Sequence, residues 1–384
     1  MHKTGIEDKY IIKNNKKMRF GFTTGTCAAA AAKGATWMLL NDELIENMKL
    51  MTPKGIELSL PLLDIERGNN YVSCGVTKDA GDDPDMTDGL TVYAKAEKTE
   101  KTGVKIKGGE GVGIITKKGL EQPVGEAAIN STPRKMIFDG VSEIIEASGF
   151  GGGIEITVSV PGGQETAQKT FNPRLGIEGG ISILGTSGIV EPMSEAALLK
   201  SIETELNQLL ALGHKNLVVT LGNYGKAFLD ELDSLPMKES VKCSNYIGQV
   251  IDMAVAGQAE GMLFVAHLGK FVKVAGGIMN THSRDADSRM EIIAGNALKA
   301  GISAEIALKI LDAPTTDEAV SILKEHGALE NVMELLMEKI SFYLGHRAYN
   351  RIPIEAIVFS NEYGFLGKTA GADEMIEKIK KERG

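Results

Sequence analysis

Apolar and polar residues alternate in short runs along the first half of the chain. The clearest run is 154–160, in which Ile154, Ile156 and Val158 share one side while Glu155 and Thr157 share the other. This period of two predicts a half-buried antiparallel strand. Similar runs, separated by glycine, proline and aspartate, predict further strands at 55–62, 71–77, 90–98, 104–109 and 112–116.

Two stretches of this half favour helices instead. Residues 27–47 are rich in alanine and leucine and lack proline, and Thr26 stands where an N-cap residue is expected. Residues 133–148 begin with Pro133, which suits the first turn of a helix. Strands combined with two helices predict an α+β domain, for which we set the bounds 1–175.

The second half has a different pattern. Its apolar runs do not alternate, and helical segments such as 194–213 and 245–257 separate them. Continuous β-branched runs between helices are typical of a parallel sheet covered on both faces. These runs lie at 181–185, 216–222, 261–267 and 354–360. A chain of 384 residues exceeds one ordinary core, so the sequence predicts two domains, of the α+β and α/β classes, with the mostly parallel α/β sheet in 176–384.

Composition narrows the classes of partner. The formal net charge is −9 and aromatic residues make up 5% of the chain, which argues against nucleic-acid binding. No apolar run approaches the roughly 18 residues that cross a bilayer, and we see no secretory signal. Three widely spaced cysteines, Cys27, Cys74 and Cys243, favour a reducing compartment. We therefore expect a cytoplasmic protein without a membrane partner, in which an anionic ligand needs a local cluster of Arg and Lys.

Small and polar residues follow each apolar run of the second half. Ligands of open α/β sheets bind beyond the carboxyl ends of the strands. Four glycine-containing loops at one edge therefore favour a binding crevice over ordinary turns. The loop residues, in chain order, are Gly185, Thr186 and Ser187, then Gly222, Asn223, Tyr224 and Gly225, then His267 and Lys270, then Asn361 and Glu362.

The segment 267–291 is the most charged of these neighbourhoods. Lys270 and Lys273 are one helical turn apart near a helix N-terminus, where lysines are unfavourable unless an anion compensates them. An anionic ligand and a solvated first turn both fit this spacing. His267 is either a general acid or base or a satisfied structural residue. His282 lies near two aspartates, but a helix start explains that cluster better than a metal site does.

The stretch RFGFTTGTCAAAAAKGA, residues 19–35, places small hydroxyl residues before the alanine run. Cys27 would have a lowered pKa as a nucleophile at a helix N-terminus. Alternatively, free amides with Thr23, Thr24 and Thr26 form a cradle for an anion, or the threonines only cap the helix. No histidine lies near Cys27 in the sequence, so the anion cradle is favoured. The acidic loop 78–89 is either a solvated turn or the holder of a cationic group such as a sulfonium.

Several long motifs, in order, resemble those of the cobalt-precorrin-5B (C1)-methyltransferase family of anaerobic cobalamin biosynthesis. They are RFGFTTGTCAAAAAKGA, DAGDDPDMTDG, GGEGVGIITKKGLEQPVGEAAINSTPRKMI, KTFNPRLGIEGGISILGTSGIVEPMSEAAL and HLGKFVKVAGGIMNTHSRDAD. The resemblance runs from about Arg19 to Gly367. The chain reads DPDMT where the family usually has DPDVT, a minor departure.

The resemblance implies transfer of a methyl group from S-adenosylmethionine to C-1 of a cobalt-containing corrinoid precursor. It also implies a first domain similar to the second domain of ribosomal protein S5. The cobalt belongs to the substrate, so we predict no protein-bound metal. Because the substrate carries several carboxylates, the candidate binding residues are cationic or hydroxyl side chains in the motifs. They are Arg19, Thr23, Thr24, Thr26, Arg134, Arg174, Lys270 and Lys273.

The remaining roles are our own hypothesis, because the family lacks the glycine-rich signature of the common methyltransferases and its motifs do not place the cofactor. We expect substrate carboxylates at the TTGT helix mouth and at NPRLG, across the domain interface, with S-adenosylmethionine in the α/β crevice. The cofactor candidates are Gly185, Thr186, Ser187, Gly222, Asn223, Tyr224, Gly225, Asn361 and Glu362. Any proton transfer is assigned to His267 or His282, while positioning of an already activated methyl group supplies most of the catalysis.

Two other classes of protein also fit the residues. A small-molecule kinase would use GFTTGTCAAAAA as a phosphate-binding loop in an S5-like domain, and would bind Mg·ATP. A non-catalytic tetrapyrrole carrier would bind the corrinoid without affinity for a methyl donor. The sequence leaves open whether the chain acts as a monomer or as a homo-oligomer.

Overall fold

The computed structural model describes residues 3–13, 15–222 and 240–383, and it divides into two compact units, Met1–Glu195 and Ala196–Gly384. Each unit has its own hydrophobic core. The sequence places the division at 175/176 instead. The structure assigns residues 176–195 to the first unit because two short strands of this segment pair there, as described next.

Strands β12 (Ile177–Glu178) and β13 (Ile189–Val190) are the two strands concerned. β12 pairs with β10 (Ile114–Ile115), and β13 pairs with β3 (Gly21–Phe22). Between them, the apolar run 181–185 bridges to Val112 and Ile129. The expectation that this run is a strand of the second domain's sheet is therefore wrong.

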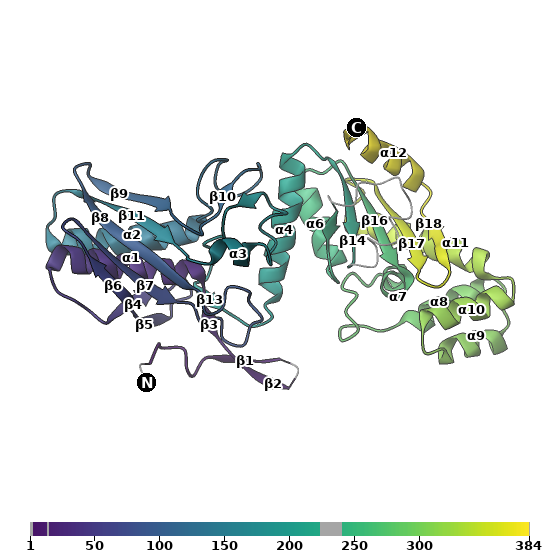
Figure 1. Cartoon of the computed structure of the whole chain (residues 1–384). Coiled ribbons are helices and arrows are strands. Elements are labelled where there is room, and N and C mark those ends of the chain that lie inside the picture. The colour runs from purple at the N-terminus through teal and green to yellow at the C-terminus, as the bar shows by residue number, and fades with distance from the viewer. Residues whose placement is uncertain (1–2, 14, 223–239, 384) are drawn as a thin grey trace. The chain divides into compact units, whose positions relative to one another are not determined.

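The first unit contains a five-stranded sheet with helices α1 (Thr24–Asn41) and α2 (Ser131–Ser148) packed against each other and against the sheet (Figure 1). The strand order is β6-β7-β8-β11-β9, and only the β11–β9 pair is parallel among these strands. The bounds are β6 Leu63–Arg67, β7 Tyr71–Thr77, β8 Thr91–Thr99, β11 Gly153–Ser159 and β9 Gly103–Gly108. The smaller elements are β1 Tyr10–Lys13, β2 Lys16–Arg19, β4 Asn47–Met51, β5 Glu57–Pro61 and α3 Gly163–Ala167.

The alternation in 154–160 correctly identifies a strand. Ile154, Ile156 and Val158 are fully buried, whereas Glu155 and Thr157 on the other side of β11 are only partly buried. An alternating pattern arises because α1 and α2 pack on this sheet and bury the side chains of the face that they contact. The first unit is therefore α+β.

Helix α1 begins earlier than the sequence suggests. Thr23, in an extended conformation, is the N-cap residue, and its Oγ1 accepts a hydrogen bond from the Thr26 amide at 3.2 Å. The prediction of Thr26 as N-cap is wrong, because Thr26 already lies in the first turn. The alanines after it are fully buried, and their small side chains allow α1 to pack closely on its neighbours.

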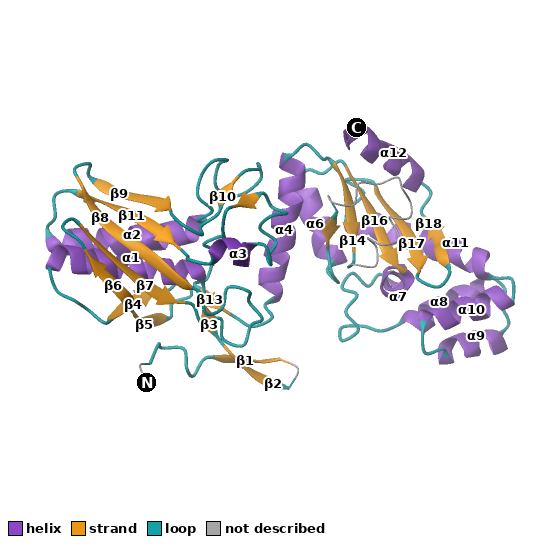
Figure 2. Ribbon diagram, viewed as in Figure 1, coloured by secondary structure: helices purple, strands orange, loops and turns teal. Residues whose placement is uncertain are grey.

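The second unit is a sheet with helices on both faces (Figure 2). The strand order is β15-β14-β16-β17-β18; the first four strands are mutually parallel, and β18 is antiparallel to β17. The mostly parallel sheet is thus confirmed. The bounds are β14 Asn216–Thr220, β15 Val241–Lys242, β16 Gly261–His267, β17 Ile354–Ser360 and β18 Gly364–Lys368.

Most helices cover one face of this sheet, and α12 (Ala372–Arg383) packs on the other. The larger group consists of α4 Glu195–Ala211, α6 Ile247–Ala256, α7 Leu268–Phe271, the 3-10 helix η2 Val272–Gly276, α8 Arg289–Lys299, α9 Ala304–Asp312, α10 Thr316–Glu325 and α11 Leu329–Arg347. Because both faces are covered, all five residues of β14 are buried, which explains the continuous apolar run.

The strand order fixes where connections diverge. The chain leaves β14 toward β15 on one side, and leaves β16 toward β17 on the other. β14 and β16 are neighbours, so the sheet has its topological switch point between them. In open α/β sheets, ligands bind beyond the carboxyl ends of the strands at this point.

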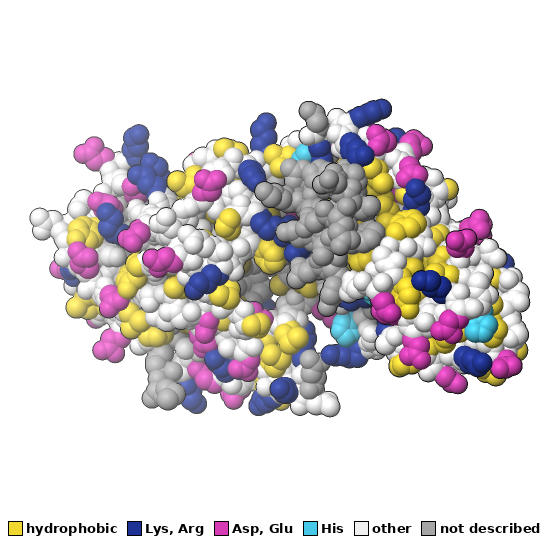
Figure 3. All heavy atoms as spheres, turned by 45° about the vertical axis from the view of Figure 1, so that its right-hand side comes forward, with side chains coloured by type: hydrophobic (Ala, Val, Ile, Leu, Met, Phe, Trp, Pro, Cys, Tyr) yellow, Lys and Arg dark blue, Asp and Glu magenta, His cyan; other side chains and the backbone are white. Residues whose placement is uncertain are grey.

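Among the described residues, no helix combines the length and the apolar character needed to cross a bilayer. Figure 3 shows Lys and Arg side chains interspersed with Asp and Glu over the face in view.

Candidate active site

The carboxyl ends of β14, β16 and β17 bring together several residues expected in the crevice of the second unit. Gly222 follows β14, His267 ends β16, and Asn361 and Glu362 follow β17. Apart from its chain neighbours, no atom of the described residues lies within 4 Å of a Cβ built at Gly222. The candidates Asn223, Tyr224 and Gly225 lie outside the described residues.

His267 is half buried at the end of β16 and is bound by backbone amides from two segments. The Gly269 amide donates to Nδ1 at 3.0 Å, and the Asn361 amide approaches Nε2 at 3.3 Å. A neutral imidazole accepts at one nitrogen only, so the ring satisfies one of these amides at a time. Burial lowers the pKa of His267, and nearby Asp317 raises it less. His267 is therefore held neutral, the protonation state of a base.

Ser360 anchors the loop after β17 through hydrogen bonds. Its hydroxyl donates to the Asp317 carboxylate at 2.7 Å and accepts from the amides of Glu362 and Tyr363 at 3.1 and 3.3 Å. Ser360 is buried, while Asn361 and Glu362 are exposed. The loop thus presents two exposed polar residues on a rigid support.

Lys270 and Lys273 have unlike environments, contrary to the expectation that they share a face. Lys273 is 1% exposed, and its Nζ donates to the carbonyls of Ala286 and Thr281 at 2.8 and 3.2 Å. Burial lowers its pKa. Lys270 is exposed, and its Nζ lies 3.1 Å from Asn245 Oδ1. Lys273 holds the chain around 281–286 in place, whereas Lys270 remains accessible.

His282 lies on the segment that covers Lys273. It is exposed, and its Nδ1 accepts from the Arg284 amide at 3.1 Å. Arg284 is exposed beside it. In the part of the chain that the structure describes, no group of three or more His, Cys, Asp or Glu side chains is arranged to hold a metal ion.

The predicted anion cradle at the start of α1 is filled by the protein itself. Thr24 Oγ1 accepts from the Leu184 amide at 3.0 Å, and Thr26 Oγ1 donates to the Gly188 carbonyl at 2.7 Å. Thr23, Thr24 and Thr26 are all buried. These contacts match the capping interpretation. Binding of a substrate carboxylate would require the hydroxyls to exchange these partners.

Gly185, Thr186 and Ser187 form the turn that closes this helix mouth, in the first unit. Gly185 has φ of +134°, and a Cβ there would lie 2.3 Å from Thr23 Oγ1, so only glycine fits. Ser187 Oγ donates to the Ile189 carbonyl at 2.9 Å. Their assignment to S-adenosylmethionine stays a prediction, because their observed contacts are with α1 and their own turn.

Arg19 faces the acidic loop. Its terminal nitrogens donate to the two carboxylate oxygens of Asp79 at 2.6 and 2.8 Å. Lys78, which is buried, pairs with Asp85. The loop therefore binds cationic groups of the chain's own, which accounts for part of its acidity. Arg19 is paired with Asp79 in this structure, and its role toward a substrate carboxylate stays a prediction.

Arg134 and Arg174 differ in how far they are exposed. Arg134 Nε donates to the Ile129 carbonyl at 2.8 Å, and another nitrogen donates to the Ala127 carbonyl at 3.3 Å. Arg134 thus supports the chain before α2. Arg174 is exposed. Nearby Asn172 is buried and binds Gly180 and Ser182, which shapes the NPRLG turn.

Cys27 is not a nucleophile in this structure. It is fully buried in α1, and burial raises its pKa to about 12. The thiolate, which is the reactive form, is therefore negligible at neutral pH.

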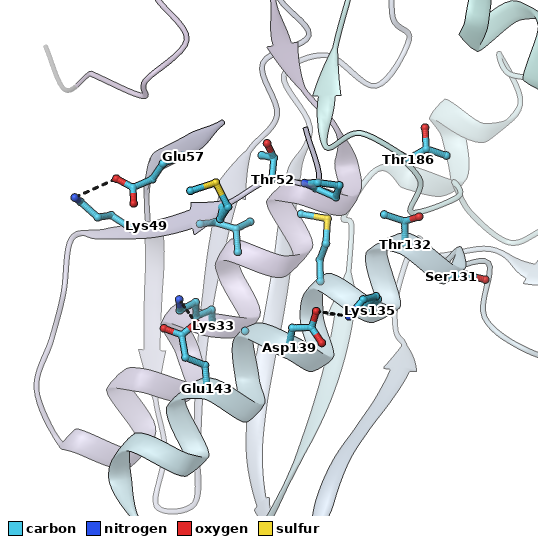
Figure 4. A pocket seen from close by; sticks show the side chains of 15 residues that line it. Lys33, Lys49, Thr52, Glu57, Ser131, Thr132, Lys135, Asp139, Glu143 and Thr186 are labelled. Carbon is cyan, nitrogen blue, oxygen red and sulfur yellow. Dashed lines mark hydrogen bonds and ion pairs between the residues drawn. The ribbon is translucent and has the colours of Figure 1, made fainter. Parts of the chain in front are cut away.

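A groove of about 840 Å³ lies in the first unit, between α1, α2 and the β4–β5 hairpin (Figure 4). Thr186 is at its edge, and Leu50, Pro53 and Met136 contribute apolar surface. Its lysines all face carboxylates of the same groove, so the lining gives no net attraction for an anion. The pairs are Lys33–Glu143, Lys49–Glu57 and Lys135–Asp139.

The sequence pattern does not predict a binding role for Thr220, the last residue of β14. It is 1% exposed, and its Oγ1 has no hydrogen-bond partner among the described residues. The available signal was a hydroxyl inside the apolar run LVVTL. Thr220 therefore differs from the apolar residues of β14, whose side chains only pack in the core.

Comparison with known proteins finds matches along most of the chain. A family model described as CbiD matches residues 11–192, and one described as CbiD, C-terminal domain, matches residues 280–370. A Ruminiclostridium cellulolyticum protein named cobalt-precorrin-5B C(1)-methyltransferase is 47% identical, covering 98% of this chain and 99% of that protein. An Alkaliphilus metalliredigens protein of the same name is 45% identical, covering 98% of each.

One solved structure is also similar in sequence. It is the 1.9 Å crystal structure of a cobalamin biosynthesis protein (cbiD) from Archaeoglobus fulgidus. The two chains are 31% identical, over 76% of this chain and 88% of that one, with a TM-score of 0.38.

Proposed function

This chain belongs to the CbiD family, and from that membership we propose that it is a cobalt-precorrin-5B C(1)-methyltransferase. It transfers the methyl group of S-adenosylmethionine to C-1 of cobalt-precorrin-5B, giving cobalt-precorrin-6A in the anaerobic route to cobalamin. The observation that carries the proposal is 47% identity, over nearly the full length of both chains, to a relative of that name.

In this proposal, S-adenosylmethionine binds at the carboxyl edge of the sheet in the second unit. Two features support that site: the switch point between β14 and β16, and the loop, anchored by Ser360, that presents Asn361 and Glu362. Asn223, Tyr224 and Gly225 remain part of the proposed site by sequence. Gly185, Thr186 and Ser187 close the mouth of α1 in the first unit, and their assignment to the cofactor stays a sequence prediction.

The corrinoid carries several carboxylates, and exposed cations are the groups to bind them. Arg174 and Lys270 keep this role, and exposed His282 and Arg284 beside the Lys273 loop extend it. Arg134 and Lys273 support the fold through hydrogen bonds to backbone carbonyls, and Arg19 is paired with Asp79 but remains 43% exposed. The threonines at the start of α1 support the turn at residues 185–188, since Thr24 binds Leu184 and Thr26 binds Gly188.

Catalysis is then mainly positioning of an activated methyl group against a ring carbon, which contributes roughly 7–11 kcal/mol in well-oriented reactions. The cobalt is part of the substrate. His267, neutral at physiological pH, is in the state to accept a proton, and His282 is the alternative group. Any such transfer occurs at the imidazole nitrogens.

Three further properties belong to the proposal. The first unit resembles the second domain of ribosomal protein S5, with two helices on one face of its sheet. The protein is cytoplasmic, in keeping with three free, buried cysteines. Its partners are the corrinoid and the methyl donor rather than a nucleic acid. The first unit also bears on the kinase alternative, because residues 182–189 occupy the start of α1, where a nucleotide phosphate would have to bind.

Thermal unfolding with separate ligands tests the proposal. A ligand at 100 times its dissociation constant adds about 2.7 kcal/mol of stability. We expect S-adenosylmethionine and S-adenosylhomocysteine to raise Tm and Mg·ATP to leave it unchanged. An anaerobic assay with cobalt-precorrin-5B should then yield a product heavier by one methyl group in place of a hydrogen. Stabilisation by Mg·ATP alone would favour the kinase, and corrinoid binding without methylation would favour the carrier.

A further inference from the structure

Thr220 presents a buried hydroxyl to which no described residue forms a hydrogen bond. Its side chain is 1% exposed, and within the described ranges Oγ1 has neither a donor nor an acceptor at hydrogen-bond distance. Its backbone is engaged normally, since the Thr220 carbonyl accepts from the Cys243 amide at 2.9 Å. The anomaly is therefore confined to the hydroxyl.

A hydroxyl in this state destabilises the folded protein. Buried polar groups are almost always paired, and one without a partner loses its hydration without compensation. Valine has nearly the same shape and occurs beside it in β14, at Val218 and Val219. The threonine is thus a residue for which packing gives no reason.

Its place in the sheet supplies a reason. Thr220 is the last residue of β14 and pairs in register with Val265 of β16, so it stands at the switch point. Val218, two residues earlier, packs with Val265 on the α12 face of the sheet. Because side chains alternate along a strand, Thr220 points to that same face at the carboxyl edge.

The neighbours on this face are mostly apolar, since Val218, Val265 and Phe359 belong to the buried cluster that packs on α12. His267 follows Val265 by two residues on β16, and its ring lies edge-on to Phe359, with centroids 5.7 Å apart. Ordinary strand spacing places the Cα atoms of Thr220 and His267 about 8 Å apart. Apolar walls with a few well-placed polar groups are typical of small-molecule sites.

We infer that the Thr220 hydroxyl forms a hydrogen bond with S-adenosylmethionine at the junction of β14 and β16. This inference rests on the proposed function for the identity of the ligand. Thr220 is then a binding residue, and its hydroxyl finds in the ligand the partner that the described residues do not provide.

Calorimetric titration of the full chain with S-adenosylhomocysteine tests the inference. Thr220→Val removes only the hydroxyl, and we expect about tenfold weaker binding, the effect of one lost hydrogen bond. Its Tm without ligand should equal or exceed that of the wild type, because the unpaired hydroxyl is gone. Thr220→Ser keeps the hydroxyl and should bind within about threefold of the wild type.

Thr281→Val is a matched control. Thr281 is also buried, with an unpartnered Oγ1, but it lies beside the end of β15, where its amide donates to the Asn245 carbonyl. Its replacement should leave the affinity unchanged. Equal binding by wild type and Thr220→Val, or equal weakening in Thr220→Val and Thr281→Val, would overturn the inference alone. No binding by the wild type would instead overturn the proposed donor, and the inference with it.

Discussion

Arg19 and Asp79 form a two-pronged ion pair across 60 residues of sequence, with nitrogen–oxygen distances of 2.6 and 2.8 Å. Arg19 also binds the acidic loop through its backbone, since its carbonyl accepts from the Asp82 amide at 3.0 Å. The pair therefore joins the end of β2 to the acidic loop 78–89. A cation in this position serves the fold before it serves a ligand.

Replacing either partner should weaken the fold slightly. The side chains are 43% and 39% exposed, so we expect Arg19→Gln and Asp79→Asn each to lower the free energy of unfolding by at most about 1 kcal/mol. Arg19 lowers the pKa of Asp79, so this stability is present above the unfolded pKa and is lost as pH falls through the folded pKa. Urea unfolding at pH 7 and below pH 3 measures it. Additive effects in the double variant would show that the pair is not coupled.

Alanine substitutions at two glycines of the acidic loop distinguish the cost of backbone strain from the cost of a steric clash. Gly81 and Gly89 both have positive φ, but only at Gly81 would a Cβ meet another atom, the Arg19 carbonyl at 2.3 Å. Gly89→Ala should cost about 1–2 kcal/mol, the cost of a left-handed residue. Gly81→Ala should cost clearly more, roughly 3 kcal/mol or above. Similar losses in the two variants, measured by urea unfolding, would mean that the loop moves away from Arg19.

Substitution of Lys273 should reduce the stability of the fold, whereas substitution of Lys270 should reduce substrate binding. Lys273→Met leaves the Thr281 and Ala286 carbonyls without their donor, and should lower the free energy of unfolding by roughly 1–3 kcal/mol. Lys270→Ala should change stability by less than about 0.5 kcal/mol and raise KM for the corrinoid. Unfolding and methylation assays on both variants check this. An unchanged KM in Lys270→Ala would remove Lys270 from the substrate site.

His267 should make the fold sensitive to acid. Its pKa is lowered in the folded state, so the unfolded chain takes up a proton first as pH falls below about 6.5. The wild type should therefore lose stability between pH 7.5 and 5, and the loss should stop below the folded pKa. His267→Gln should lose less over the same range. Parallel curves for the two proteins would mean that the pKa of the ring is the same in the folded and the unfolded state.

The three cysteines should resist alkylation. Cys27, Cys74 and Cys243 are buried, and burial raises the pKa of each thiol to about 12. Iodoacetamide at pH 7.5 should modify none of them in the native protein and all three in urea, as counted by mass spectrometry. Activity should survive this treatment. Rapid native labelling of Cys27 with loss of activity would restore the nucleophile hypothesis.

The sequence predicts elements better than it predicts their partners. The runs at 216–222 and 261–267 are strands of the parallel sheet because continuous burial leaves a readable pattern. The run 181–185 has the same apolar pattern, yet it bridges to Val112 and Ile129 in the other unit. Composition alone does not say which buried surface an apolar run will meet.

The candidate site shows the same limit for charged residues. Lys270 and Lys273 are alike in type and close in sequence, and only the chain that folds over Lys273 distinguishes them. Arg19 and Arg134 lie in motifs, but tertiary contacts decide that they bind protein oxygens. Thr220 was overlooked because one hydroxyl in an apolar run signals nothing until its burial and lack of a partner are known.

The closure of α1 by residues 182–189 also affects how the chain folds during synthesis. Thr24 and Leu184 are 160 residues apart, a distance that a ribosome translating at about 5–20 residues/s covers in about 10–30 s. Until then the first turn of α1 lacks its partners, and its buried alanines face an incomplete core. The first unit thus depends on a late-made segment, and a nascent chain stalled before residue 182 carries an unfinished domain.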